Sequence, residues 1–327
     1  MTDSTSRLAV ALAGALGSDR VARDRELAPL TTFKVGGPAD IYVEPRSSDE
    51  VLLALRLAHA HGIGVTLLGG GSNVLVADRG VRGLLLRPRG GRITLEGPGR
   101  VRADAAVTIN GLVRWLIGHG LQGLEAWAGT PGTVGGGVYG NAHWGGRLLS
   151  EQIVEARLAA EGGAVRDVPA SGMEFGYDRS RLQRTGEVLL SAVFAVQPGD
   201  PDALRAVARE SLAFRKRTQP LASPSAGCIF QNPAPDAALP VGVPPSAGAL
   251  IDRAGLKGVQ LGGARVSPTH ANFIVNTGTA SAADIRALVE RCRTAVADRF
   301  GIGLIEEIVY LGEFDQPPGG VRGDPAD

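Results

Sequence analysis

The chain has 327 residues, enough for two or three domains, and its 34 Lys and Arg against 33 Asp and Glu give a formal net charge of +1. So balanced a charge offers no strong field for nucleic acid or an anionic membrane, and we expect neither as a partner. Glycine supplies 47 residues, about twice its usual share, in clusters without a three-residue period, which excludes collagen and indicates tight turns.

The cysteines and the apolar runs exclude two further classes. Cys228 and Cys292 are too few for a disulfide framework and fit a reducing compartment. No apolar run reaches the ~18 residues of a membrane span. Residues 8–17 resemble a short signal-peptide core, but their spacing also fits a small helix, which we favour. Residues 1–30 are therefore predicted to form an N-terminal helical arm.

Residues 31–197 are punctuated by glycine and rich in predicted strands, and we interpret them as the first domain. Residues 48–61 have apolar side chains at helical spacing after an N-cap at Ser47 or Ser48, and residues 110–119 form a second predicted helix. The predicted strands cover residues 41–44, 65–68, 84–86, 101–107, 153–159 and 188–196.

Residues 198–312 alternate predicted helices and strands, which indicates an α+β or α/β second domain. A proline-rich stretch at 233–245 is predicted to be a surface loop, and the tail at 313–327 to be disordered. The predicted helices cover 200–217, 247–254 and 281–300, and the predicted strands cover 271–276 and 304–311.

A first glycine cluster follows a predicted strand. Gly69, Gly70 and Gly71 allow positive φ and let backbone N–H groups converge, and Ser72 and Asn73 add side-chain donors. Such a cluster can hold a pyrophosphate with little net charge, although it is neither a Walker loop nor a GxGxxG motif. A glycine-rich hairpin is the alternative, and the cluster alone does not decide between the two.

A second cluster places seven glycines within 18 residues, from Gly123 to Gly140. Each glycine costs up to ~1 kcal/mol inside a helix or strand, so the stretch is predicted to be a loop. Close approach of a ligand to the backbone would explain it, and a flat ring system lying against the main chain fits. A long structural loop is the alternative.

Six motifs in order resemble the UDP-N-acetylenolpyruvoylglucosamine reductase (MurB) family, and together they cover about residues 30–312. The short interval between Tyr177 and Cys228 resembles the family form that lacks an extra substrate-covering loop. The motifs are TFKVGGPA at 32–39, GGGSNVLV at 69–76, GLEAWAGTPGTVGGGVYGNA at 123–142, PSAGCIFQNP at 224–233, AGALIDRAGLKG at 247–258 and GGARVSPTHANFIVN at 262–276.

The resemblance implies a mixed α+β (α/β) chain, with an FAD-binding domain of the vanillyl-alcohol-oxidase (PCMH) type over 31–197 and a MurB-type α+β substrate domain over 198–312. It implies bound FAD, NADPH as hydride source, and reduction of UDP-N-acetylenolpyruvoylglucosamine to UDP-N-acetylmuramate in peptidoglycan precursor synthesis. The residues expected to bind FAD lie in the two glycine clusters and are Gly69, Gly70, Gly71, Ser72, Asn73, Ala128, Gly129, Pro131, Gly132, Thr133, Gly135, Gly136, Asn141 and Ala142.

The resemblance also implies a proton donor and a C-terminal glutamate. The donor, a serine in the family, matches Cys228, and an ordinary cysteine thiol with a pKa of ~8.5 is a better acid than an alcohol. A small buried apolar residue is the alternative. The glutamate matches Glu307; neighbours on a strand face opposite sides, so only one of Glu306 and Glu307 can face the site. An exposed edge-strand pair is the alternative.

The third expected group is a cation beside the substrate carboxylate. The family's arginine directly follows a tyrosine, whereas here Asp178 follows Tyr177 and would oppose the negative charge that develops on the substrate. Either Arg179 or Arg181 is therefore expected to supply the cation, and we prefer Arg179. Because an ideal strand would turn Arg179 away from the side of Asp178, this assignment requires a bend or bulge.

Four residues are expected to bind the substrate, namely Tyr177, Lys216, Gln231 and Asn232. Lys216 and Arg217 could contact the nucleotide phosphates or complement the dipole at the end of the 200–217 helix, and both interpretations stay open.

Several residues and functions remain as alternatives. His270 is expected to be structural and Cys292 a core residue, and no His, Cys and Asp cluster has metal-ligand spacing, so we expect no metal. Another flavin oxidase or dehydrogenase of the same fold is one alternative function. A non-catalytic flavin or UDP-sugar binding protein is the other, motivated by Asp178. We expect a small-molecule substrate, a cytoplasmic location and a monomer.

Overall fold

The computed structural model describes residues 3–234, 239 and 242–314. Contacts divide the chain into two compact units. The first unit joins the chain's first 25 residues with Ala39–Gly70 and Arg82–Arg215. The second unit joins Glu26–Pro38, Gly71–Val81 and the chain from Lys216 onward.

The two units interleave along the chain, whereas the sequence predicted consecutive domains with a boundary at residues 197 and 198. One reason is a strand pair in the second unit. There β4 (Val74–Val76) runs parallel to β18 (Val309–Leu311), with Leu75 opposite Tyr310. This pairing draws a segment from the middle of the predicted first domain into the unit that contains the C-terminal strand.

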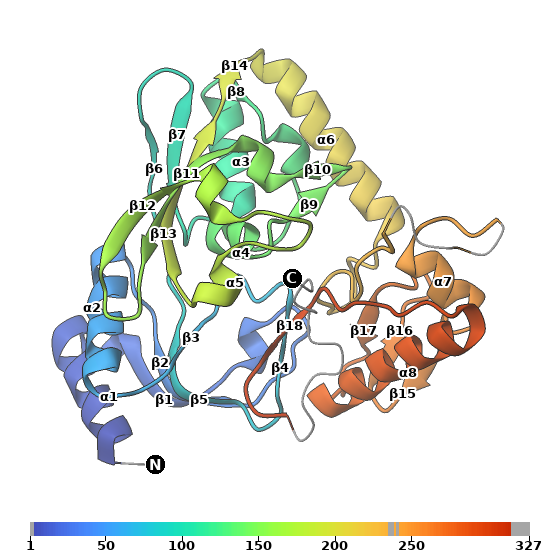
Figure 1. The fold of residues 1–327 in the computed structure, drawn as a ribbon, viewed down its shortest axis with the longest axis horizontal. Coiled ribbons are helices and arrows are strands. Elements are labelled where there is room, and N and C mark those ends of the chain that lie inside the picture. Colours follow the sequence, from blue (N-terminus) through green and yellow to red (C-terminus); the bar gives the residue numbers. More distant parts are fainter. Residues whose placement is uncertain (1–2, 235–238, 240–241, 315–327) are drawn as a thin grey trace. The chain divides into compact units, whose positions relative to one another are not determined.

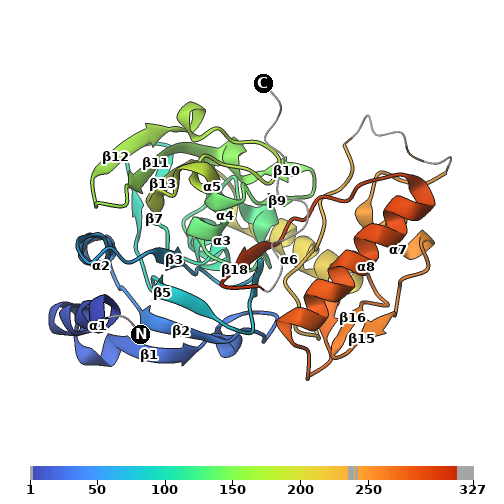
Figure 2. The ribbon, with the colours of Figure 1, turned by 60° about the horizontal axis from the view of Figure 1, so that its bottom comes forward.

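A four-stranded sheet in the order β1-β2-β5-β3 lies in the first unit, and Figure 2 shows the helices α1 and α2 beside it. Its β3 and β5 strands run parallel. Leu8 and Leu12 of α1 are fully buried in a core shared with β2, β5 and α2. The elements are α1 (Asp3–Leu16), β1 (Val21–Glu26), β2 (Pro38–Val43), α2 (Ser48–Ala60), β3 (Val65–Leu67) and β5 (Val81–Leu86).

The prediction of a helical arm over residues 1–30 is only partly right. The helix α1 ends before Gly17, whose φ of 99° lies in a region that favours glycine. Beyond it, β1 is a strand at the edge of the sheet, not a helix. Pairing with β2 overrides local propensity here, and the charged sequence VARDRE suits an edge that must not pair with other chains. Short 3-10 turns flank it, η1 (Ser18–Arg20) and η2 (Ala28–Leu30).

A five-stranded antiparallel sheet in the order β12-β11-β13-β7-β6 forms the second layer of this unit (Figure 1). Its central strand β13 is buried at seven consecutive residues, as expected for a strand covered on both faces. The helices α3 and α4 contribute to the same core. The elements are β6 (Ile93–Leu95), β7 (Arg100–Asp104), α3 (Ile109–Gly118), α4 (Val134–Tyr139), β11 (Ile153–Ala159), β12 (Val165–Pro169) and β13 (Val188–Ala195).

The expectation that the second glycine cluster is a loop is wrong at α4. This short helix has the sequence VGGGVY and begins after Thr133, whose side chain accepts a hydrogen bond from the Gly136 amide at 3.2 Å. A Cβ on Gly137 would lie 2.9 Å from Cδ2 of Leu149. Close packing against the core therefore compensates for the low helix propensity of glycine.

The first unit also contains several short elements and most of a longer helix. The helix α6 (Pro201–Thr218) begins in the first unit and buries Leu204, Ala208, Ser211 and Arg215. The others are β8 (Leu121–Gln122), η3 (Glu125–Trp127), β9 (His143–Trp144), β10 (Arg147–Leu148), η4 (Leu149–Gln152), η5 (Ala170–Met173), α5 (Leu182–Thr185) and β14 (Gln197–Pro198).

The second unit contains an antiparallel three-stranded sheet packed against two helices. Cys292 of α8 is 1% exposed, and burial raises the pKa of its thiol to about 12. The position of Cys292 agrees with the expected core role. The elements are α7 (Ala247–Arg253), β15 (Gln260–Leu261), β16 (Ala264–Val266), β17 (Ile274–Asn276) and α8 (Ala282–Phe300).

The predicted strand over 304–311 is broken in the structure. Glu306 forms an isolated bridge with Phe230, and only the last three residues form β18. The predicted strand over 271–276 likewise shrinks to β17. The predicted loop at 233–245 and tail at 313–327 lie partly outside the described residues, at 235–238, 240–241 and 315–327.

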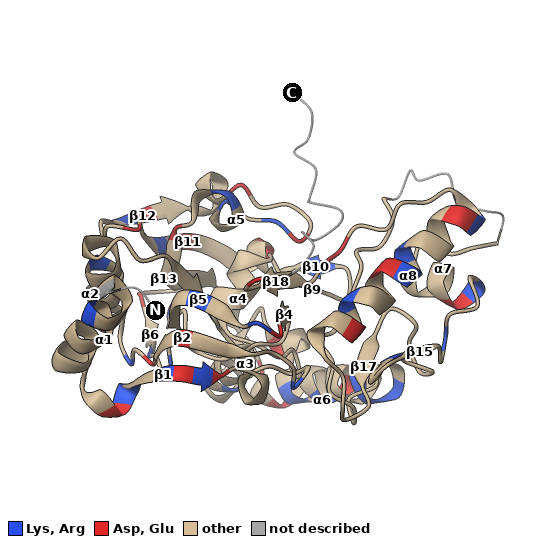
Figure 3. Ribbon diagram, turned by 90° about the horizontal axis from the view of Figure 1, so that it is seen from below, with Lys and Arg blue, Asp and Glu red and all other residues tan. Residues whose placement is uncertain are grey.

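Charges of both signs are interspersed along the ribbon, for example on α6 and α8 (Figure 3). This mixture agrees with the balanced composition. None of the described helices combines the length and the apolar character that crossing a membrane requires.

Candidate active site

Two glycine-rich loops meet in the first unit. Gly69 and Gly70 follow β3, and Gly132 and Thr133 precede α4. A Cβ on Gly70 would lie 2.6 Å from Cα of Gly132, and one on Gly69 would lie 2.7 Å from Oγ1 of Thr133. Side-chain carbons do not approach other atoms so closely, so only glycine fits where the backbones cross. The structure therefore brings together residues from both predicted FAD-binding clusters.

Three other amides of the second cluster are engaged within the protein. The N–H of Gly129 donates to Asn110 Oδ1 at 2.6 Å, that of Gly135 to a backbone carbonyl at 2.8 Å, and that of Gly136 to Thr133 Oγ1. These three amides are therefore satisfied by acceptors within the protein. Ala128 is buried and Pro131 is exposed.

Asn141 is fully buried and makes two hydrogen bonds through its side chain. Its Oδ1 accepts from the Ser150 amide at 2.9 Å, and its Nδ2 donates to the Gly176 carbonyl at 2.8 Å. The next amide, of Ala142, donates to the Gly137 carbonyl at 2.8 Å. Asn141 thus anchors the turn that begins at Gly176, a positioning role that sequence reasoning did not assign.

The remaining residues of the first cluster belong to the second unit. The Gly71 carbonyl accepts from the Thr32 amide at 2.9 Å. Ser72 is half-buried, and Asn73 donates through Nδ2 to the Glu307 carbonyl at 3.2 Å. Asn73 therefore fixes the backbone at one of the predicted catalytic residues.

Arg215 of α6 is a buried cation that sequence reasoning missed. Its side chain contacts the second glycine cluster: Nη2 donates to Thr130 Oγ1 at 2.7 Å, and a Cβ on Gly129 would lie 3.1 Å from its Cδ. The guanidinium lies 3.4 Å from the ring centroid of Trp144, and its buried Nε has no hydrogen-bond partner within the described part of the chain. Burial lowers the pKa of Arg215 to about 10. The available signal was a cationic residue within the apolar stripe of the predicted helix.

The bend required for Arg179 is present. The Gly176 amide donates to the Arg179 carbonyl at 3.0 Å, and the Arg179 amide donates back at 3.2 Å, which closes a tight turn around Tyr177 and Asp178. Asp178 takes a φ of 51° in this turn. Arg179 is exposed and its guanidinium lies over Gly176, where an added Cβ would be 3.2 Å from Nε.

Arg181 is engaged in a structural contact. Its Nε donates to Glu187 Oε2 at 2.9 Å, and its Nη1 donates to the Gly172 carbonyl at 2.9 Å. Arg166 contacts the same carboxylate, and although burial acts in the opposite direction, these partners hold the pKa of Glu187 below its usual value. This geometry favours Arg179 over Arg181 as the candidate cation.

Asp178 lies against an imidazole. Its carboxylate is buried, and Oδ1 lies 3.0 Å from Nδ1 of His143. The other ring nitrogen of His143 lies 3.3 Å from the Tyr177 hydroxyl, and the two rings pack with centroids 4.7 Å apart. The structure thus brings Tyr177 and Asp178 into contact with His143, a residue that sequence reasoning did not single out.

In the second unit the segment around Cys228 is held by hydrogen bonds on two sides. The Glu307 amide donates to the Ile229 carbonyl at 2.8 Å, and the Gln231 amide donates to the Ile305 carbonyl at 2.9 Å. On the other side, the buried side chain of Asn272 pairs with the backbone of Phe230. It accepts from the Phe230 amide at 3.0 Å and donates to the Phe230 carbonyl at 2.8 Å. Cys228, which is half-buried, and Glu307 therefore lie on adjacent backbone segments with a fixed register.

Glu306 and Glu307 differ in environment. Glu306 is 5% exposed and forms ion pairs with Arg286, at 3.3 Å, and with Arg293 of α8. Glu307 is half-buried. Because Glu306 neutralises arginines of the core helix, it is committed to structure, which leaves Glu307 as the candidate catalytic carboxylate.

The predicted substrate-binding residues of the second unit differ in exposure and in their hydrogen bonds. Lys216 and Arg217 are exposed at the end of α6. Gln231 is half-buried, whereas Asn232 accepts from the Ala247 amide at 3.1 Å at the start of α7. His270 accepts through Nδ1 from the Asn272 amide at 3.3 Å, which fits the structural role expected for it.

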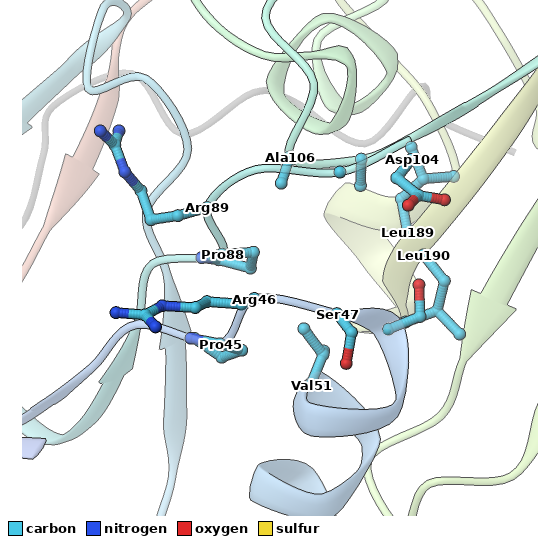
Figure 4. A pocket seen from close by; sticks show the side chains of 13 residues that line it. Pro45, Arg46, Ser47, Val51, Pro88, Arg89, Asp104, Ala106, Leu189 and Leu190 are labelled. Carbon is cyan, nitrogen blue, oxygen red and sulfur yellow. The ribbon is translucent and has the colours of Figure 1, made fainter. Parts of the chain in front are cut away.

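A pocket of the first unit opens near the start of α2, and Figure 4 shows Arg46, Ser47, Arg89, Asp104 and Leu190 around it. None of the residues predicted to bind FAD or substrate lines it. The pocket is therefore separate from the crossing of the two glycine loops.

Two models of known protein families match successive parts of this chain. A model of an FAD binding domain matches residues 39–168, and a model of the UDP-N-acetylenolpyruvoylglucosamine reductase C-terminal domain matches residues 219–311. The reductase of that name from a Synechococcus species is 41% identical over 92% of this chain and 94% of its own length. The Bacillus subtilis reductase is 37% identical over 90% and 94%.

The chain belongs to the UDP-N-acetylenolpyruvoylglucosamine reductase family. The crystal structure of the MurB reductase from Thermus caldophilus superimposes with a TM-score of 0.74 at 31% identity, covering 89% of this chain and 99% of that one. These matches confirm the predicted family, and they confirm the predicted fold of an FAD-binding domain followed by a MurB-type C-terminal domain.

The residues of this MurB family member fit FAD. At the crossing of Gly70 and Gly132 the two backbones approach so closely that only glycine fits, and Arg215 presents a buried Nε donor beside the second glycine cluster. An anionic dinucleotide would find there both main-chain groups and a cation. Gly69, Gly70, Gly132, Thr133 and Arg215 are therefore the residues that would hold it.

Proposed function

We propose that the chain reduces UDP-N-acetylenolpyruvoylglucosamine to UDP-N-acetylmuramate in peptidoglycan precursor synthesis, using FAD and NADPH. The observation that carries the proposal is the alignment of named reductases along about 90% of the chain. The crossing of Gly70 and Gly132 supports it, because it brings residues of both predicted FAD-binding clusters together. Bound FAD supplies the hydride that the substrate receives.

We assign the proton-donor role to Cys228. An ordinary thiol is mostly protonated near neutral pH and is a much stronger acid than an alcohol. The hydrogen bonds from Gln231 and Glu307 on one side and Asn272 on the other hold the backbone beside this thiol. A donor held in one place can deliver its proton to the substrate carbon without first reorganising.

We assign stabilisation of the charge on the substrate carboxylate to Arg179, with Glu307 as a further catalytic group. Arg179 is exposed in a tight turn, whereas Arg181 is committed to Glu187. We further propose that Tyr177, Lys216, Gln231 and Asn232 bind the substrate; Oδ1 of Asn232 already accepts one hydrogen bond, from the Ala247 amide of α7.

The presence of Asp178 where the family has an arginine does not by itself favour a non-catalytic binding protein. Its carboxylate lies 3.0 Å from the His143 ring, so its charge has a partner inside the protein. We also propose a cytoplasmic location and a monomer. Size-exclusion chromatography with light scattering tests the monomer, and a dimer mass would contradict it.

Anaerobic stopped-flow spectroscopy tests the reaction. NADPH should bleach the yellow protein, and the enolpyruvyl substrate should restore its colour. Fast reoxidation by air with no response to that substrate would instead favour an oxidase. Bound FAD that NADPH does not reduce would favour a binding protein.

A further inference from the structure

Arg215 of α6 is a buried cation that no carboxylate of the described residues neutralises. It is 6% exposed, and burial is the one cause that lowers its pKa, to about 10, so the guanidinium stays charged near neutral pH. An unpaired charge inside a protein is costly. An anionic ligand would remove this cost, and the second glycine cluster, where FAD is expected, lies directly beside the guanidinium.

One donor of this guanidinium is committed to the second glycine cluster, and another is left over. Nη2 donates to Thr130 Oγ1 at 2.7 Å. Nε is buried, has no hydrogen-bond partner among the described residues, and lies 3.7 Å from the point where a Cβ on Gly129 would stand. Because buried N–H groups without a partner are rare in folded proteins, this donor marks a place for an acceptor that the described residues do not supply.

Trp144 covers the face of the same guanidinium. The centre of the guanidinium lies over the indole ring, 3.4 Å from the ring centroid. The indole is fixed in turn, because its Nε1 donates to Ser211 Oγ at 3.1 Å and that hydroxyl donates to the Ala126 carbonyl at 2.7 Å. An aromatic face attracts a cation without cancelling its charge, and stacking leaves the N–H donors in the plane of the guanidinium available.

We propose that Trp144 is a positioning residue that holds the charged Arg215 side chain in place for FAD, so that the guanidinium meets an anionic or carbonyl oxygen of this cofactor without first being ordered. A carboxylate in the place of the indole would neutralise Arg215 and repel the diphosphate of FAD. This role goes beyond the reaction proposed above and rests only on Arg215 as an FAD-binding residue.

A double-mutant cycle on the holoenzyme tests this role. The variants are Trp144→Leu, which removes the ring face, Arg215→Met, which removes the cation, and the double variant. Trp144→Phe keeps a ring face but loses the indole N–H. Trp115→Leu is the matched control, because Trp115 is also half-buried against the same core but stacks on His119.

Serial dilution of each holoenzyme gives the dissociation constant of FAD from the fluorescence of the released flavin, excited in the visible range where tryptophan does not absorb. We expect Arg215→Met to raise this constant at least tenfold, as for loss of a hydrogen bond from a charged group. Trp144→Leu should raise it about threefold to tenfold, because FAD must then order a free arginine side chain.

The two changes should not add. In the Arg215→Met background, Trp144→Leu should change the dissociation constant by less than about twofold, since both changes act through one contact. Trp144→Phe should stay within about twofold of the wild type, and Trp115→Leu should match it. An equal loss from Trp144→Leu with and without Arg215 would show that the indole only supports the loop, and wild-type affinity of Trp144→Leu would likewise overturn the role.

The midpoint potential of the flavin identifies which part of FAD Arg215 meets. The isoalloxazine ring gains negative charge on reduction, whereas the diphosphate keeps its charge. A lower potential in Arg215→Met therefore assigns the contact to the ring, and an unchanged potential assigns it to the diphosphate. If the potential falls in Arg215→Met, it must also fall, by less, in Trp144→Leu, and an unchanged potential there would contradict the positioning role.

Two other outcomes are separable from these. Should Trp144→Leu fold poorly, Trp144→Met, which fills the space without a ring face, takes its place and must show the same coupling to Arg215→Met. A wild-type holoenzyme that holds FAD but does not respond to the enolpyruvyl substrate would overturn the proposed function and leave the role of Trp144 intact.

Discussion

The contact between the two glycine loops predicts a strong effect of a single added methyl group. In Gly70→Ala the new Cβ would lie 2.6 Å from Cα of Gly132. Because carbon atoms in contact prefer about 3.5–4.0 Å, the loops must separate by roughly 1 Å. Such overpacking costs about 1–3 kcal/mol. The backbone groups that we propose to bind FAD would move by the same amount.

If that cost falls on the FAD-bound form, the dissociation constant of FAD rises by about 5- to 150-fold. Titration of apoprotein with FAD, followed by quenching of flavin fluorescence, measures this change. Gly14→Ala is the control, because a Cβ there meets nothing within 4 Å in the exposed face of α1. Wild-type FAD affinity and an unchanged melting temperature in Gly70→Ala would refute the argument that these backbones must touch.

Three further predictions concern the site and its stability. Cys228→Ser should keep substantial turnover, whereas Cys228→Ala should still be reduced by NADPH but reduce the substrate very slowly; normal turnover of Cys228→Ala in stopped flow would remove it as proton donor. Arg179→Ala should lose about 2.7–4 kcal/mol of transition-state stabilisation in kcat/KM, as for loss of an oxyanion donor, and near-normal kcat/KM would direct attention to Arg181. Burial, aided by the charge of Lys257, holds the pKa of His270 below its usual 6.5. The unfolded chain therefore takes up this proton first, so stability falls as the pH drops below about 6.5, and His270→Gln should flatten the melting temperature between about pH 5 and 6.5; equal slopes for wild type and variant would contradict this.

Local sequence determined the elements whose signals are short-range. The Ser47 hydroxyl accepts from the Glu50 amide at the start of α2, as its position before the apolar periodicity predicted. The helix predicted over 281–300 begins one residue later, because Ser281 is the N-cap of α8. The alternation in 153–159 predicted β11 with its full bounds. These predictions succeed because capping and periodicity involve residues within one or two helical turns.

The glycine clusters show where such reasoning reaches its limit. Sequence alone predicted that Gly69 and Gly70 belong with Gly132 and Thr133 in an FAD site, and the fold places them in contact. It did not predict α4, because a run of three glycines has poor helix propensity when packing is ignored. Only the contact of Gly137 with Leu149 reveals why glycine is tolerated there.

The family motifs were likewise enough to predict the reductase fold, whereas the roles of single charged groups required the tertiary structure. Asp178 meets His143 across 35 residues of sequence, and Glu306 meets Arg286 across 20. Arg215 is buried beside Thr130 from a separate helix. No periodicity or composition signals such pairs, because a carboxylate or guanidinium is satisfied by whichever group the fold brings within hydrogen-bond distance. Sequence therefore fixed which residues are available, and packing decided which of them face each other.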